Sequence, residues 1–155
     1  ALRTANDWLT GKDNTAVDFE AVRGTAGLKQ AGVNIAGKDY KVAVASGAAA
    51  AKCVMDKLKA GNPDGWSFIE IMGCPGGCVN GGGQPIQPQY VRDTVDLKAI
   101  RAKALYEQDA SMKLRKSHES PVIKTLYSEW YDGFGGHKAH HDLHTSYVAR
   151  EKFSK

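Results

Sequence analysis

Hydrophobic and polar positions along the first 45 residues follow two different periods. Apolar residues recur at helical spacing over residues 1–9, and this pattern stops at Gly11. Residues 31–36 and 40–45 instead alternate between apolar and polar or small side chains, which is typical of strands. We therefore expect a short helix followed by two neighbouring strands or a hairpin, joined around Gly37.

A further helix and strand are predicted next. Residues 48–60 are rich in alanine and favour a helix, on which we expect Cys53 to face the sheet as a buried structural thiol. The turn at residues 62–65 precedes a short apolar strand over residues 66–72. This order indicates an α/β layer, a sheet flanked by helices. In open sheets of this kind, ligands usually bind beyond the carboxyl ends of the strands.

The second half of the chain is mainly helical. Residues 97–114 are rich in helix formers, and Ser120 with Pro121 is a start signal for another helix that ends before Gly133. We place a division near Pro88, so that residues 1–90 form one domain and residues 91–155 a helical extension. The histidines of the tail include pairs four residues apart. We expect packed, hydrogen-bonded side chains there, with a metal site as the alternative: His137, His140, His141 and His144.

Composition and charge narrow the classes of function. The 155 residues carry a net charge of +4 without a dense Lys/Arg stripe, so nucleic-acid binding is not favoured. The short basic run at residues 113–116 is expected to be solvated, or else to dock an acidic protein. The longest apolar run, residues 42–51, is too short to span a membrane. No initiator Met or signal peptide precedes the first helix, so we expect the chain to begin within a domain.

Two of the three cysteines lie in a glycine-rich stretch that follows the last strand. Cys74 and Cys78 flank Pro75, Gly76 and Gly77, which disfavour a helix and predict a loop on which the two thiols converge. So few cysteines argue against a disulfide framework and favour a bound metal or a reducing compartment. Zinc held with histidines is one candidate.

An iron–sulfur cluster is the other candidate, because glycines let backbone N–H donors approach electron-rich sulfurs. The glycines available for this are Gly76, Gly77, Gly81, Gly82 and Gly83. A cubane normally takes four cysteines, and only Cys53 is left in this chain. Two ligands are therefore expected from elsewhere.

The run FIEIMGCPGGCVNGGGQP, residues 68–85, closely resembles the third active-site signature of the [FeFe]-hydrogenases. Its fixed positions are all matched: Glu70, Met72, Cys74, Gly77, Cys78, Gly81, Gly82, Gly83 and Pro85. LYEQDASMKLRKSHESPVIKTLYSEW (105–130) and HHDLHTSY (140–147) resemble the small-subunit region of iron hydrogenases. FEAVRG (19–24) and KVAVASG (41–47) are similar to the catalytic domain of this family.

The resemblance implies one lobe of the hydrogenase catalytic domain, followed by a mainly helical small-subunit-like region, and the reaction 2H+ + 2e− ⇌ H2. It implies that Cys74 ligates the [4Fe-4S] part of an H-cluster. Cys78 would bridge that cubane to a two-iron subcluster that carries CO, cyanide and a dithiolate. Met72 matches the methionine that packs against the two-iron unit, while Gly73 stands where alanine is more frequent.

The resemblance also implies partners. Two further cysteine signatures of the family, and its proton-relaying cysteine, are absent from this sequence. Another chain or segment is therefore expected to carry them, and this chain alone is not expected to be a competent hydrogenase. A ferredoxin or similar electron carrier, accessory [4Fe-4S] clusters upstream and a cytoplasmic location are implied, with the periplasm or an organelle left open. The alternative is a hydrogenase-like protein that binds a [4Fe-4S] cluster without H2 chemistry.

Overall fold

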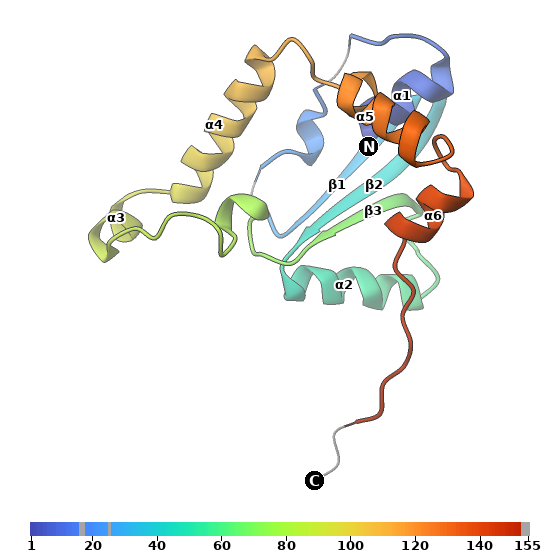
Figure 1. Cartoon of the computed structure of the whole chain (residues 1–155). Coiled ribbons are helices and arrows are strands. Elements are labelled where there is room, and N and C mark those ends of the chain that lie inside the picture. The colour runs from blue at the N-terminus through green and yellow to red at the C-terminus, as the bar shows by residue number, and fades with distance from the viewer. Residues whose placement is uncertain (16–17, 25, 153–155) are drawn as a thin grey trace. The chain divides into compact units, whose positions relative to one another are not determined.

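A computed structural model describes residues 1–15, 18–24 and 26–152, which fall into two compact units, Ala1–Arg115 and Lys116–Lys155 (Figure 1). The first unit is built on a three-stranded sheet in the order β1-β2-β3. Strand β1 (Leu28–Ile35) is antiparallel to β2 (Lys38–Ser46), and β2 is parallel to β3 (Trp66–Met72). The predicted α/β class is confirmed, and β3 has the bounds that the sequence pattern predicts.

The first two strands form the hairpin that the alternating pattern predicts. Ala36 and Gly37 make the two-residue turn, with φ of 53° and 79°. Both lie in the left-handed region, which matches the right-handed twist of the flanking strands. The strands extend beyond the alternating residues because their ladder pairs Leu28 with Ala45 at one end and Ile35 with Lys38 at the other.

Helix α2 (Ala48–Lys59) connects the two parallel strands and covers one face of the sheet (Figure 1). Its sheet-facing side follows helical spacing through Ala50, Val54 and Leu58, and Val54 is fully buried. Cys53 is exposed, so the prediction of a buried thiol is wrong. The reason is geometric, since Cys53 is rotated by about 100° from Val54 around the helix.

The opposite face of the sheet is covered by shorter elements. Helix α1 (Leu2–Thr10) ends at Gly11 in a left-handed conformation, as predicted, and a 3-10 turn, η1, spans Glu20–Val22. Leu2, Ala5, Phe19 and Val22 pack against a buried cluster in the hairpin that consists of Val33, Ile35 and Val42. This face also carries Phe68, Glu70 and Met72, because they pair with Val42, Val44 and Ser46 of β2.

Two helices follow the sheet within the first unit, α3 (Gln89–Thr94) and α4 (Leu97–Ser111). The side chain of Asp96 caps α4 by accepting a hydrogen bond from the Ala99 N–H. This helix ends before the predicted residue 114, since the backbone is extended at Met112. Arg115 belongs to an ion-pair network and is 21% exposed, so the expectation of a fully solvated basic run is wrong for this residue.

The second unit contains short helical segments. They are η3 (Ser117–Glu119), α5 (Pro121–Thr125), a π-helical turn η4 (Leu126–Trp130) and α6 (His137–Leu143). The helix predicted from Pro121 is present, but it widens at Leu126, whose carbonyl accepts a hydrogen bond from the Tyr131 N–H at 3.0 Å. In the tail, the rings of His140 and His144 stack with 4.3 Å between their centroids.

Within the described ranges, no helix is both long and apolar enough to cross a bilayer. The division into domains 1–90 and 91–155 stays a prediction.

Candidate metal centre

The cysteine loop begins where β3 ends, beside the carboxyl end of β2. The Gly47 N–H donates to the Met72 carbonyl at 2.8 Å and ties the two strand ends together. Gly47 has φ of 92°, and a Cβ there would lie only 3.3 Å from Pro75 Cγ. Glycine at position 47 thus lets the loop fold back against the sheet, at the edge where the sequence predicts a ligand.

Short-range hydrogen bonds close the loop around both cysteines. The Gly77 N–H donates to the Cys74 carbonyl at 2.9 Å, and after a 3-10 turn, η2 (Cys78–Asn80), the Gly81 N–H donates to the Cys78 carbonyl at 3.1 Å. These two N–H groups are therefore engaged within the loop. That glycine N–H groups of this loop approach a cluster stays a prediction.

Met72 lies against the bare Cα of Gly77. A Cβ at Gly77 would be 3.2 Å from Met72 Sδ and 4.0 Å from the hydroxyl of Ser46. Gly81 lies beside Cys74, since a Cβ there would be 3.6 Å from Cys74 Sγ. A side chain at position 77 would therefore crowd the Met72 sulfur, whereas one at position 81 would touch Cys74 Sγ at an ordinary contact distance.

A cavity of about 180 Å³ opens beside the loop. Four of the five predicted site residues line it: Met72, Gly76, Gly77 and Cys78. The fifth, Cys74, is half-buried and lies against Gly81. Cys78 is exposed in the described structure. The two cysteines thus have different surroundings, although they belong to the same short loop.

Three polar residues also line this cavity: Lys29, Tyr106 and Glu70, a fixed position of the signature for which the sequence predicted no role of its own. Burial lowers the pKa of Lys29, while the charge of Glu70 acts to raise it. The Lys29 ammonium donates to the Gly24 carbonyl at 2.9 Å. The place of Glu70 in the signature, two residues before Met72 on the same face of β3, indicates that Glu70 belongs to the site. Lys29 lies in none of the quoted motifs, and the run at residues 105–130 that contains Tyr106 does not predict its place at this cavity.

Helix α4 is hydrogen-bonded to the part of the loop that follows Cys78. The Arg101 guanidinium donates to the Val79 carbonyl at 3.3 Å and to the Pro85 carbonyl at 2.8 Å. Val79 and Ala102 are both buried. This anchor keeps the segment after Cys78 folded against the rest of the unit.

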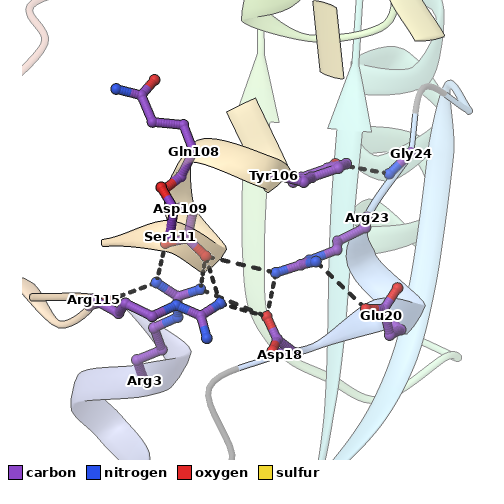
Figure 2. A network of polar contacts seen from close by, with 10 residues as sticks. All are labelled: Arg3, Asp18, Glu20, Arg23, Gly24, Tyr106, Gln108, Asp109, Ser111 and Arg115. Atoms are coloured by element: carbon purple, nitrogen blue, oxygen red, sulfur yellow. Dashed lines mark hydrogen bonds and ion pairs between the residues drawn. The ribbon is translucent and has the colours of Figure 1, made fainter. Parts of the chain in front are cut away.

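A network of charged side chains fastens α4 to α1 and to the segment before β1 (Figure 2). Its members are Arg3, Asp18, Arg23, Asp109 and Arg115. Asp109 is its centre, since it accepts two hydrogen bonds from Arg3 and one from Arg115, each at 2.7 Å. These bonds hold the pKa of Asp109 well below its usual range.

The network extends to the wall of the cavity through Arg23. Its guanidinium lies 4.6 Å from the ring centre of Tyr106. The Tyr106 hydroxyl accepts a hydrogen bond from the Gly24 N–H at 3.1 Å, as Figure 2 shows. Because Gly24 and Tyr106 both line the cavity, the ion pairs help to fix part of its wall.

The residues at this edge of the sheet fit an iron–sulfur cofactor. Cys74 and Cys78 supply thiolate ligands, the donors that such clusters require. Gly77 makes room for the Met72 side chain beside the loop, and Gly81 lies next to Cys74 Sγ. The hydroxyl of Ser46 is buried, and no partner is found for it among the residues that the structure describes. A sulfur-rich group bound there would supply acceptors.

Gly77 offers a direct test of this geometry. With φ of 83° and ψ of −166°, it occupies a region open almost only to glycine. We expect Gly77→Ala to lower the free energy of unfolding by about 1–3 kcal/mol and to displace Met72. Gly83→Ala is the matched control, because a Cβ there meets nothing within 4 Å. Equal thermal unfolding of the two variants would contradict the expected strain.

Comparison with known proteins gives consistent matches. A family model described as iron only hydrogenase large subunit, C-terminal domain, matches residues 1–82, and the iron hydrogenase small subunit model matches residues 95–150. The chain is 40% identical over 152 residues to the NADP-reducing hydrogenase subunit of Solidesulfovibrio fructosivorans, covering 98% of this chain and 25% of that protein.

Two further matches are informative. An [FeFe]-hydrogenase structure from Chlamydomonas reinhardtii is similar with a TM-score of 0.69 and 34% identity, over 96% of this chain and 43% of that one. A probable cytosolic Fe-S cluster assembly factor of Drosophila ananassae is 38% identical over 115 residues, which is 72% of this chain and 22% of that protein. The chain thus spans about a quarter of the length of these curated relatives.

Proposed function

Because this chain belongs to the iron-only hydrogenase family, we propose that it forms part of an enzyme that interconverts H2 with protons and electrons. The observation that carries the proposal is the cavity at the carboxyl end of β3, which brings Met72, Gly76, Gly77 and Cys78 together. A site that binds only a cubane would need thiolate ligands and no more. Met72 and the closely packed glycines add a shaped apolar wall beside one thiolate.

The cofactor we propose is an H-cluster, a [4Fe-4S] cubane joined to a two-iron subcluster. Cys74, held against Gly81, would ligate the cubane, and Cys78, at the cavity, would bridge it to the two-iron part. Met72, which lines the same cavity as Cys78, would pack against the two-iron part, and Gly76 and Gly77 would let the backbone approach it closely. When bound, the cofactor supplies the redox-active iron at which H2 is formed or split heterolytically.

The remaining ligands of the cubane have to come from residues other than Cys74 and Cys78. Cys53 is the third cysteine of the chain and lies exposed on α2. We propose that another chain or segment supplies the missing cysteines, together with any accessory [4Fe-4S] clusters. A ferredoxin or similar carrier would exchange electrons with the cofactor, and we place the reaction in the cytoplasm.

The second candidate is a protein that binds a cubane without H2 chemistry. The similarity to a probable Fe-S cluster assembly factor favours this reading. The two candidates differ in what lies beside Cys78. The hydrogenase needs a two-iron unit in the cavity, whereas the alternative needs only the cubane that Cys74 and Cys78 ligate.

Infrared spectroscopy separates the two candidates. We expect the protein, purified without oxygen together with the segment that completes the ligand set, to show bands of CO and cyanide bound to iron. Electron paramagnetic resonance of the same sample reports the cubane independently. A cubane signal without those infrared bands would reject the hydrogenase and support the alternative, and the absence of both would reject the iron–sulfur site itself.

A further inference from the structure

We propose that Ser46 is an additional cofactor-binding residue, whose hydroxyl donates a hydrogen bond to a sulfur atom of the iron–sulfur cofactor. This inference rests on the proposed function only so far as a cubane is bound. Ser46 belongs to none of the sequence patterns that assign a role to the loop. It precedes Gly47 at the end of β2, on a different strand from the two cysteines.

The hydroxyl of Ser46 is buried and has no hydrogen-bond partner within the described ranges. The residue is 5% exposed. Its backbone N–H is already used, because it donates to the Gly27 carbonyl at 2.6 Å. A buried hydroxyl that makes no hydrogen bond costs about 1–3 kcal/mol, and buried polar groups in folded proteins are rarely left so. An acceptor that binds at this position would remove that cost.

The position of Ser46 directs the hydroxyl toward the site. Ser46 pairs with Met72 across the parallel strands, so both side chains emerge on the face of the sheet that carries the cavity. The point where a Cβ of Gly77 would stand lies 4.0 Å from the Ser46 hydroxyl and 3.2 Å from Met72 Sδ. Because Gly77 has no side chain, its Cα, the Ser46 hydroxyl and the Met72 thioether lie close together where the loop meets the sheet.

The chemistry of the available acceptors favours the cofactor over Met72. A thioether sulfur is a weak hydrogen-bond acceptor. Cluster sulfides and cysteine thiolates carry negative charge, and hydrogen bonds to charged acceptors are shorter and about twice as strong. Such a bond stabilises the reduced, more negative cluster, and hydrogen bonds to the sulfurs are one of the factors that set cluster potentials.

The test is the midpoint potential of the cubane in Ser46→Ala, followed by electron paramagnetic resonance during a redox titration of the loaded protein. We expect the potential to become more negative than in the wild type. Ser67→Ala is the matched control, since Ser67 is an exposed serine on β3 outside the cavity, and its potential should equal that of the wild type. Equal potentials in all three proteins would overturn the proposal.

Thermal unfolding of the cofactor-free protein gives a second readout. Removing a hydroxyl that has no partner should leave the midpoint of Ser46→Ala unchanged or raised. A clear decrease would show that the hydroxyl is bonded within the protein itself, and would also overturn the proposal. A negative potential shift without CO and cyanide bands would uphold the role of Ser46 while rejecting the hydrogenase. An unchanged potential together with those bands would overturn the role of Ser46 and uphold the hydrogenase.

Discussion

Replacing Cys78 with alanine should abolish H2 evolution by the assembled protein. Cys78 lines the cavity beside Met72 and is the residue that we propose joins the cubane to the two-iron unit. Loss of an outer-shell partner already costs about 10–100-fold in metal affinity or activity, so loss of a bridging ligand should exceed 100-fold. The measurement is H2 evolved from a reduced electron donor, together with the infrared bands of the iron-bound ligands, which should disappear.

The third cysteine provides a matched control for this experiment. Cys53 is exposed on α2 and is rotated by about 100° from Val54 on the side that packs on the sheet, so Cys53→Ala should retain both activity and infrared bands. Circular dichroism of each cofactor-free variant checks that the fold is kept. Wild-type rates in Cys78→Ala, or an equal loss in both variants, would contradict a bridging role for Cys78.

The sequence predicted the sheet and the location of the cysteine loop because local signals carried both. The Ala36–Gly37 turn sets the register of the hairpin, and β3 has a clear apolar run between a turn and glycine. Cys53 shows the limit of such signals. A helix places adjacent residues about 100° apart, so an error of one position in the buried side exchanges a core residue for an exposed one.

The wall of the cavity could not be predicted, because its residues come together only through tertiary contacts. Tyr106 on α4 meets Gly24, which lies 82 positions earlier in the chain. Each residue lies in a quoted motif, but neither motif predicts this contact. Ser46 is a similar case, since its significance arises from burial and a missing partner within the described structure. Alternating patterns identify which face a side chain occupies, but they do not identify its hydrogen bonds.

Replacing Asp109 with asparagine should lower the free energy of unfolding by about 2 kcal/mol. Its carboxylate, 30% exposed, accepts bonds from Arg3 and Arg115, and Arg23 lies 3.9 Å away (Figure 2). An amide removes the negative charge and leaves these guanidinium groups close to one another. Glu107→Gln on the same helix is the control. Glu107 is 67% exposed in a surface pair with Lys103, and such pairs contribute at most about 1 kcal/mol.

The same substitution predicts a pH dependence. Bonds from Arg3 and Arg115 lower the pKa of Asp109 in the folded state, whereas an aspartate in an unfolded chain titrates near pH 3.9, roughly the model-peptide value. The stabilisation is therefore complete above that pH and is lost as the pH falls through the lowered native value. Urea unfolding of wild type and Asp109→Asn should give a constant difference near neutral pH and converging values below about pH 4. A difference that persists undiminished in acid would show that Asp109 stabilises the unit by packing, and that its charge has no part in joining α4 to α1.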